Sequence, residues 1–194
     1  MRLTGGGRQP REALREAFEK IVREYHSKVY NYLYYMLGDR EEAADLTQEV
    51  FVNAYAAFDR FRGDARVYTW LSRIARNLAI NRGKRRRLED KARALSLQDS
   101  REDAEAYTLP DGRPDPEAQV EAKETQEMVR LTLNAMPAAL KDVIVLRDIQ
   151  GFSYEEMSEI LGCSLEAVKS RLFRSRALLR QRLEPLLGEG TDAS

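Results

Sequence analysis

The chain has 194 residues, enough for one ordinary domain or two small ones. Its 32 basic and 32 acidic residues balance, so only local patches of charge could attract nucleic acid. The single cysteine, Cys163, excludes a disulfide framework and a cysteine-rich metal site. No apolar run approaches the ~20 residues of a membrane span, and no signal peptide opens the chain. We therefore expect a soluble, cytoplasmic protein without membrane insertion, metal or cofactor.

The N-terminal part of the chain begins with a glycine-rich segment, residues 1–10, which predicts a loose leader. Apolar residues at helical spacing then predict one helix that starts at Arg11 and a second that ends at Gly38. The only histidine, His26, has no partner in the sequence that would suggest a base or a metal ligand, so we expect a structural or surface role. No segment of the chain predicts a strand.

The next helix, after Asp39, carries an acidic face. Asp39 is placed to cap it, with Glu42 three residues on to complete a capping box. Its inward stripe is formed by Ala43, Leu46, Val50 and Ala54, and acidic and amide side chains lie on the other side. That polar face has two interpretations, a solvated surface or a docking strip for a basic partner. Periodicity alone favours the solvated surface.

Residues 60–87 interleave aromatic and basic side chains. Residues 62–64 predict a turn, and the helix that follows runs out into Gly83 and the basic residues 84–87. Aromatic planes beside arginines suit a single-stranded nucleic-acid site, because bases stack on the rings and cations hold the phosphates. The alternative is that the aromatics belong to the core. We assign Trp70 to the core, whereas Phe58, Phe61 and Tyr68 remain open between the two.

An acidic, proline-containing segment separates the two halves of the chain. Acidic residues crowd into 99–127, whereas basic residues crowd into 60–93 and 169–182. The segment 89–119 has too few apolar residues to fold alone, so we expect a flexible acidic linker. The fold class predicted is therefore all-α, with two small helical domains on a flexible tether.

The second half predicts a helix over 120–135, a break at Met136 and Pro137, and a helix over 140–149. The stretch 153–180 then has the pattern of a helix-turn-helix. A capping box at Ser153 and Glu156 opens the first helix, Gly162 suits the left-handed residue that ends it, and Ser164 is placed to cap the second.

The second of these helices has a buried stripe and a basic outer face. Leu165, Val168, Leu172 and Leu179 form the stripe, and Glu166, Ser170, Phe173, Arg174 and Ala177 lie opposite, with Lys169 and Arg171 on the flanks. An ordinary helical hairpin with solvated arginines is the alternative interpretation. The excess of basic residues over 169–182 and an aromatic side chain, Phe173, off the core stripe favour DNA binding.

Three motifs in this order resemble those of the extracytoplasmic-function (ECF) sigma factors of bacterial RNA polymerase. They are EEAADLTQEVFVNAYAAFDRFRG (41–63), YTWLSRIARNLAINRGKRR (68–86) and the segment 136–180, and the resemblance covers roughly residues 18–187. The family's pattern implies a region 2 domain at 11–88 and a region 4 domain at 120–187, joined by the linker 89–119. Residues 1–10 and 188–194 would be a disordered leader and tail.

The resemblance implies three sets of site residues and no catalytic ones, since sigma factors are not enzymes. The set that would bind core polymerase is Asp45, Leu46, Gln48, Glu49 and Phe51, which replaces the solvated-face interpretation of this helix. The set that would bind and melt the −10 element is Phe61, Arg62, Arg66, Tyr68, Arg73, Arg76, Asn77 and Arg82, with Asn77 reading a flipped base. The set that would read the −35 element is Lys169, Ser170, Arg171, Phe173 and Arg174.

The partners that the resemblance implies are core RNA polymerase, promoter DNA in duplex and single-stranded form, and a cognate anti-sigma factor, with the chain itself a monomer. The main alternative is a helix-turn-helix transcriptional regulator that binds duplex DNA without melting it. A nuclease is a poor fit, because the chain offers one histidine, one cysteine and no convincing cluster of paired carboxylates. A scaffold that binds only proteins does not account for the basic recognition face.

Overall fold

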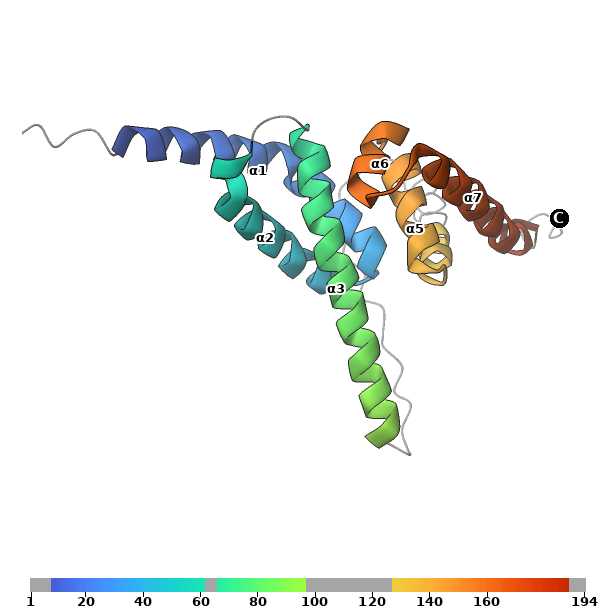
Figure 1. Cartoon of the computed structure of the whole chain (residues 1–194). Coiled ribbons are helices and arrows are strands. Elements are labelled where there is room, and N and C mark those ends of the chain that lie inside the picture. Colours follow the sequence, from blue (N-terminus) through green and yellow to red (C-terminus); the bar gives the residue numbers. More distant parts are fainter. Residues whose placement is uncertain (1–7, 62–65, 97–126, 189–194) are drawn as a thin grey trace, which may run out of the picture.

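The structure, a computed structural model, describes residues 8–61, 66–96 and 127–188, and every regular element in these ranges is helical (Figure 1). The predicted all-α fold class is confirmed. The elements are α1 (Arg8–Leu37), α2 (Arg40–Ala57), the 3₁₀-helix η1 (Phe58–Arg60), α3 (Val67–Ser96), a helical segment at 127–134, α5 (Ala138–Ile144), the π-helix η2 (Val145–Ile149), α6 (Tyr154–Leu161) and α7 (Leu165–Gly188).

The N-terminal half is a three-helix unit in which α1, α2 and α3 all pack against one another. Its core consists of fully buried apolar side chains from each helix, namely Val29, Leu33, Leu46, Val50, Leu71 and Ala75. Each buried leucine or valine contributes about 1.5–3 kcal/mol relative to an exposed one. This unit holds the outer faces of α2 and α3 in a fixed relation.

The first helix is longer than the sequence predicted. Two helices were expected between Arg11 and Gly38, but α1 is continuous from Arg8 to Leu37. No glycine or proline interrupts 11–37, and Tyr25 and Val29 continue the helical spacing, so nothing breaks the helix. Residues 8–10 of the predicted leader belong to α1, and residues 1–7 lie outside the described part. Gly38, with φ of 78°, ends the helix in the left-handed region as expected.

Helix α3 is also longer than predicted, because it passes through Gly83 and ends at Ser96. The residues after Gly83 are mostly strong helix formers, and Arg85 lies 3.8 Å from Glu89 one turn later, which favours continuation. Residues 89–96, expected to be linker, are therefore helical, and 97–119 lie outside the described residues. Figure 1 shows this end of α3 projecting away from the rest of the molecule.

The C-terminal half packs α7 against both α5 and α6. Its core contains the buried residues Val143, Ile144, Leu146, Met157, Ile160, Val168 and Leu172. Pro137 stands at the N-terminus of α5, so the predicted break at 136–137 is confirmed. The predicted helix 140–149 is present, but its last turn is a π-turn in which the Gln150 N–H donates to the Val145 carbonyl, 3.0 Å away.

The two halves are in direct contact, which the sequence did not predict. Helix α3 packs against α6, and α1 packs against α5 and η2. Buried residues of both halves form one continuous hydrophobic core. The linker composition gave no information on this contact, because it depends on apolar side chains such as Tyr32 and Phe152 that lie far apart in the sequence. Within the described ranges, no helix has the length and apolar character to cross a membrane.

Candidate nucleic-acid and polymerase interfaces

The turn between α6 and α7 has the geometry that the sequence predicted. The Ser153 N–H donates to Glu156 Oε2 at 2.8 Å, and the Glu156 N–H donates back to Ser153 Oγ at 3.2 Å, which completes the capping box. Gly162 adopts φ 63° and ψ 41°, and Ser164 Oγ accepts from the Ala167 N–H at 3.2 Å. These local bonds fix the angle at which α7 leaves α6 and define a helix-turn-helix.

Helix α7 presents an uncovered basic and aromatic face. Val168 and Leu172 are buried on its inner side, whereas Lys169, Ser170, Phe173 and Arg174 are exposed. The Phe173 side chain is 76% exposed, which is unusual for a large aromatic residue on a folded helix. Arg171 is half-buried at the edge of this face. The arrangement suits insertion into a major groove, where arginine and an apolar side chain both find partners on base edges.

The outer face of α2 is acidic, with an apolar part that the sequence analysis missed. Asp45, Gln48 and Glu49 are exposed, and Val52 and Tyr55 follow on the same side, 66% and 48% exposed. The sequence could have indicated Val52 and Tyr55, because both are apolar and lie outside the inward stripe of α2. Exposed apolar side chains beside acidic ones are typical of a protein interface.

Two residues of the predicted polymerase-binding set do not belong to this outer face. Leu46 is 1% exposed and Phe51 is 8% exposed, and both pack in the core of the N-terminal half. The resemblance assigned them with the polar residues around them, but their side chains point inward. They position α2 and offer no surface to a partner in this structure.

The predicted −10 residues divide into an exposed group and a covered group. Arg73 and Asn77 of α3 are exposed, and Phe61 is half-buried, its ring 4.8 Å from that of Trp70. Trp70 is itself half-buried and packed against the core, as expected. Arg62 lies outside the described residues. Arg82 is half-buried and lies 3.8 Å from Glu42 of α2.

Tyr68 and Arg76 form the covered group. Arg66 also contacts the C-terminal half, but its side chain is 84% exposed. Arg66 forms an ion pair with Glu156 at 3.2 Å, and Arg76 forms one with Asp142 at 2.6 Å. The side chains of Arg76 and Asp142 are only 18% and 3% exposed, so this pair is buried. In this arrangement neither Arg76 nor Tyr68 is free to contact DNA.

Tyr68 stacks with two other aromatic rings. The Tyr25 ring lies 5.4 Å away and the Phe152 ring 4.7 Å away, both nearly parallel to it. The Tyr68 hydroxyl donates to the Gln150 side chain. Burial is the main reason that the pKa of Tyr68 is well above its usual value, so the phenol stays protonated and can donate this bond.

Asp142 is the centre of a buried polar cluster between the halves. It accepts a hydrogen bond from the Tyr32 hydroxyl at 2.9 Å and pairs with Arg76. Burial raises the pKa of Asp142, while the charge of Arg76 and the two hydrogen bonds act in the opposite direction. Burial also raises the pKa of Tyr32 well above its ordinary value, which keeps its hydroxyl as a donor.

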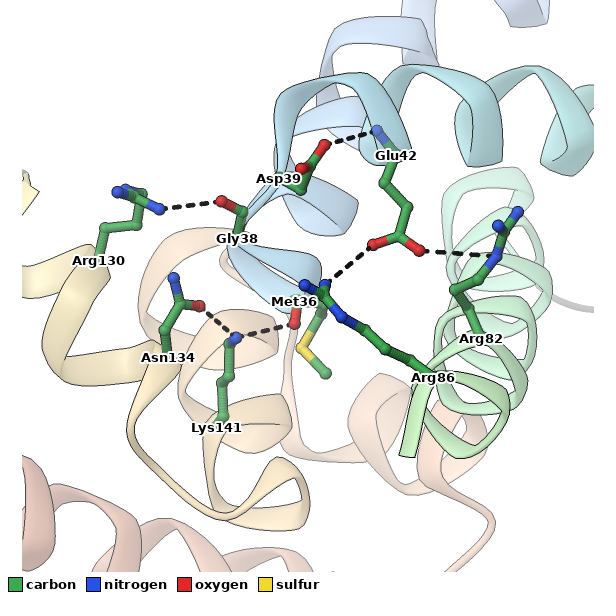
Figure 2. Close-up of polar contacts among 9 residues, drawn as sticks. All are labelled: Met36, Gly38, Asp39, Glu42, Arg82, Arg86, Arg130, Asn134 and Lys141. Atoms are coloured by element: carbon green, nitrogen blue, oxygen red, sulfur yellow. Dashed lines mark hydrogen bonds and ion pairs between the residues drawn. The ribbon is translucent and has the colours of Figure 1, made fainter. Parts of the chain in front are cut away.

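A second cluster attaches the C-terminal half to the end of α1 (Figure 2). Lys141 Nζ donates to the Met36 carbonyl at 2.8 Å and to Asn134 Oδ1 at 2.6 Å, and Arg130 donates to the Gly38 carbonyl at 3.0 Å. Cations suit this place because the last carbonyls of a helix are unpaired and carry partial negative charge. Burial, together with the nearby charge of Arg130, lowers the pKa of Lys141 to about 8.

Figure 2 also shows why Glu42 does not complete a capping box. Asp39 caps α2 as predicted, with its Oδ1 accepting from the Glu42 N–H at 2.8 Å. The Glu42 carboxylate instead turns toward α3, where it lies 3.8 Å from Arg82 and 3.6 Å from Arg86. Two guanidinium groups therefore outcompete the backbone N–H for this carboxylate.

A helix-turn-helix joined to a helical unit with basic and aromatic residues on α3 defines a two-part DNA-binding protein. Comparison with known protein families identifies the two parts. The model of sigma-70 region 2 matches residues 21–89, and the model of sigma-70 region 4 matches residues 126–179. Together the matches cover more than half of the chain, in the order that the motifs predicted.

Relatives of known function match over nearly the whole length. The chain is 35% identical to the RNA polymerase sigma-H factor of Pseudomonas aeruginosa over 182 residues, 90% of each chain. It is 36% identical to the ECF RNA polymerase sigma-E factor of Haemophilus influenzae over 180 residues, 89% of this chain and 90% of that one. The chain therefore belongs to the sigma-70 family of RNA polymerase sigma factors, in its extracytoplasmic-function group.

The fold also resembles a solved sigma factor structure. The sigma factor RpoE of Bartonella quintana, solved in complex with the anti-sigma factor NepR, superposes with a TM-score of 0.64. The match covers 87% of this chain and 98% of that chain at 22% identity. The likeness therefore extends across both halves of the fold.

Proposed function

We propose that this sigma factor uses three separate surfaces, one for core RNA polymerase and two for promoter DNA. The observation that carries the proposal is the uncovered face of α7, where Lys169, Ser170, Phe173 and Arg174 lie opposite a buried apolar stripe. These exposed side chains are not required for folding, because the buried apolar stripe alone holds α7 against the rest of the domain. In the major groove, the arginine and lysine would bond to guanine edges or phosphates, and Phe173 would contact a thymine methyl group.

Helix α3 would take the unpaired strand of the −10 element. Asn77 offers a donor and an acceptor to the edge of a flipped base, and its exposure leaves it free to do so. The arginines around it, among them the exposed Arg66 and Arg73, would hold phosphates without reading sequence. Capture of flipped bases would offset the unstacking cost, so the sigma factor would favour strand opening without bond chemistry.

Helix α2 would dock on core polymerase through its exposed face. Asp45, Gln48 and Glu49 supply the polar part of this face, and Val52 and Tyr55 supply an apolar part that a solvated helix would not need. Leu46 and Phe51 would act indirectly, by holding α2 in the core. Polymerase would thus set the spacing between the DNA-reading surfaces.

The chain is further proposed to act as a cytoplasmic monomer under the control of an anti-sigma factor. This part of the proposal is supported by the likeness to RpoE of Bartonella quintana, whose structure is that of a complex with an anti-sigma factor. An inhibitor of this kind would need to cover the exposed face of α2 or of α7, since these are the surfaces that the proposed function uses.

Transcription in vitro tests the proposed function. The full chain and a bacterial core polymerase are incubated with templates whose −35 and −10 hexamers are randomised, and the 5′ ends of the RNA are sequenced. Transcripts should share one start position and enriched hexamers only when both proteins are present. The double variant Lys169→Ala/Arg174→Ala should lose the −35 enrichment and keep binding to core polymerase. Identical 5′ ends with and without the chain would refute the proposal.

A further inference from the structure

The exposed face of α7 carries one acidic side chain that the proposed −35 set does not include. Glu166 is exposed and lies on the same side of the helix as Ser170, Phe173 and Arg174, and it is the only acidic residue in 165–182. We propose that Glu166 determines part of the −35 specificity by accepting a hydrogen bond from the amino group of a cytosine in the major groove. The inference rests on the proposed role of α7 in reading duplex DNA.

Glu166 lies at the end of α7 that a helix-turn-helix directs toward the base edges. It is the second residue of the helix, directly after the turn that Gly162 and Ser164 define. In helix-turn-helix proteins the N-terminal residues of the second helix contact the bases, while the first helix crosses the backbone. At about 1.5 Å per residue, Glu166 and Arg174 are about 12 Å apart along the helix axis, the length of about three base-pair steps. The two side chains can therefore contact different base pairs of one element.

The carboxylate of Glu166 is an acceptor in a face whose charged groups are otherwise donors. Its own backbone N–H and the Ser164 hydroxyl donate to it, and the charge of Lys169 adds a favourable interaction, so the pKa of Glu166 is lowered and the side chain stays ionised. Lys169 and Arg174 can only donate hydrogen bonds, whereas an ionised glutamate can only accept them. Phosphates repel such a carboxylate, so it weakens non-specific attraction to DNA. Its hydrogen-bonding capacity is useful only toward a base that presents a donor.

Cytosine is the base whose major-groove edge suits this carboxylate best. Its edge presents the N4 amino group as a donor and no acceptor, whereas guanine presents two acceptors, and thymine an acceptor and a methyl group. Adenine presents a donor beside the N7 acceptor, which would repel one carboxylate oxygen. A neutral glutamine both donates and accepts, so it matches adenine through two hydrogen bonds. The chemistry therefore predicts a change of preferred base, from cytosine to adenine, when Glu166 is replaced by glutamine.

A structural role is the alternative for Glu166, because a negative charge in the first turn of a helix interacts favourably with the helix dipole. The chain contains a matched position that separates the two roles. Glu155 is the second residue of α6, follows the cap Ser153 by two positions as Glu166 follows Ser164, and is also exposed. Both glutamates should contribute similarly to their own helix, but only Glu166 lies on the face of α7 that is proposed to enter the groove.

Selection of promoters by the holoenzyme tests the proposal. The full-length parent, Glu166→Gln, Glu166→Ala and Glu155→Gln are each combined with bacterial core polymerase and a promoter library that has a randomised −35 hexamer, and the bound fragments are sequenced. The parent and Glu155→Gln should enrich cytosine about tenfold over guanine or thymine at one position. At that position Glu166→Gln should enrich adenine and Glu166→Ala no base, with the remaining positions unchanged.

The result that overturns the proposal is the same base profile for the parent and both Glu166 variants. A uniform loss of enrichment at every position, with melting temperatures lowered alike in Glu166→Gln and Glu155→Gln, would assign Glu166 to helix stability and would also overturn it. In both cases the parent still enriches −35 sequences, so the proposed function of α7 stands. No enrichment by the parent at any position would refute the proposed function, and the inference with it.

Removal of the amino group from the DNA gives an independent readout. In a promoter with the selected −35 sequence, the cytosine at the position that responds to Glu166 is replaced by 2-pyrimidinone, which lacks the 4-amino group. The parent holoenzyme should bind this promoter about tenfold more weakly than the unmodified one, whereas Glu166→Ala should bind the two nearly equally. An equal loss for both proteins would show that the amino group is not recognised through Glu166 and would overturn the proposal.

Discussion

The two helices proposed to contact DNA, α3 and α7, use similar residue types but differ in how accessible these residues are. On α7 the arginine, lysine and aromatic side chains are uncovered, and the helix is fixed from behind by a buried stripe. On α3 the residues Tyr68 and Arg76 are in contact with the other half of the chain. Reading of duplex DNA requires only a rigid preformed face. A site for unpaired strands, in contrast, binds single-stranded nucleic acid with little sequence preference. In this structure, residues proposed to hold or stack on an unpaired strand are thus partly covered, whereas those proposed to read the duplex are not.

The largest effect that would sharpen this comparison is expected from Asn77→Ala. A side chain that reads a base edge contributes about 1–3 kcal/mol, so open-complex formation with core polymerase should fall by about tenfold to a hundredfold. Asn81→Ala, an exposed asparagine on the next turn of α3, is the matched control. Permanganate footprinting of the −10 region measures the opening. An equal loss in both variants would show that α3 does not read a base through Asn77.

The corresponding change on the uncovered helix is Arg174→Ala. We expect transcription from a promoter with an intact −35 element to fall by about tenfold, because one charged contact in the groove is lost. Arg180→Ala, also exposed on α7 but further from the turn, should have a smaller effect. Thermal melting of both variants should match the parent. A lowered melting temperature for Arg174→Ala would indicate a structural role for Arg174. The contrast between an uncovered α7 and a partly covered α3 would then no longer hold.

Ser153→Ala tests how the C-terminal half is held. Loss of this cap should cost about 1 kcal/mol of the free energy of unfolding, because the Glu156 N–H loses its acceptor at the start of α6. Urea unfolding followed by circular dichroism measures it, with the exposed Ser27→Ala as control. If the two variants unfold at the same urea concentration, the capping box contributes nothing to stability.

Lys141 predicts a pH dependence of the contact between the halves. Its pKa is about 8 in the folded chain and 10.5 when unfolded, so above pH 8 the unfolded state binds more protons. Stability contributed by this site should therefore rise as the pH increases from about 8 toward 10.5. The difference in unfolding free energy between the parent and Lys141→Met isolates the effect. A difference that stays constant or falls over this range would contradict the buried position of Lys141.

The smallest effect is expected from Glu42→Gln. Its ion pairs with Arg82 and Arg86 are at 3.8 Å and 3.6 Å near the surface, so their loss should cost less than about 1 kcal/mol. Single-strand binding by this variant should be unchanged or slightly tighter, since Arg82 of the proposed −10 set keeps its charge and loses a competing carboxylate. A large loss of stability would mean that α3 is positioned mainly by its contact with α2. The contact between the two halves would then be less important for its position.

The features predicted correctly from the sequence are those that depend on neighbours within one or two helical turns. Ser153, Glu156 and Gly162 specify a cap and a turn by their own chemistry, so the helix-turn-helix followed from them. The exposed face of α7 likewise followed from the period of its buried stripe. Helix lengths were less accurate, because α1 and α3 continue through residues that permit a break without requiring one.

The features that were missed depend on contacts between distant segments. Asp142 and Lys141 are charged residues, and a charged residue in a sequence is normally exposed, so nothing indicated that both would be buried against α1 and α3. For the same reason Arg76 could not be distinguished from Arg73, although one is paired and the other exposed. Leu46 and Phe51 show the opposite case, since the family motif marks the whole helix and does not distinguish its buried side from its exposed side.

The π-turn of η2 has a consequence for how this chain could change in evolution or by design. A π-turn holds one residue more than an α-turn, so deletion of a single residue from Val145–Ile149 would restore regular winding. Everything after it would then rotate by about 100° about the helix axis. Phe152 would swing away from Tyr68 while the capping box and the recognition helix kept their own internal geometry. One codon therefore decides whether Phe152 can stack on Tyr68, and with it part of the contact between the two halves.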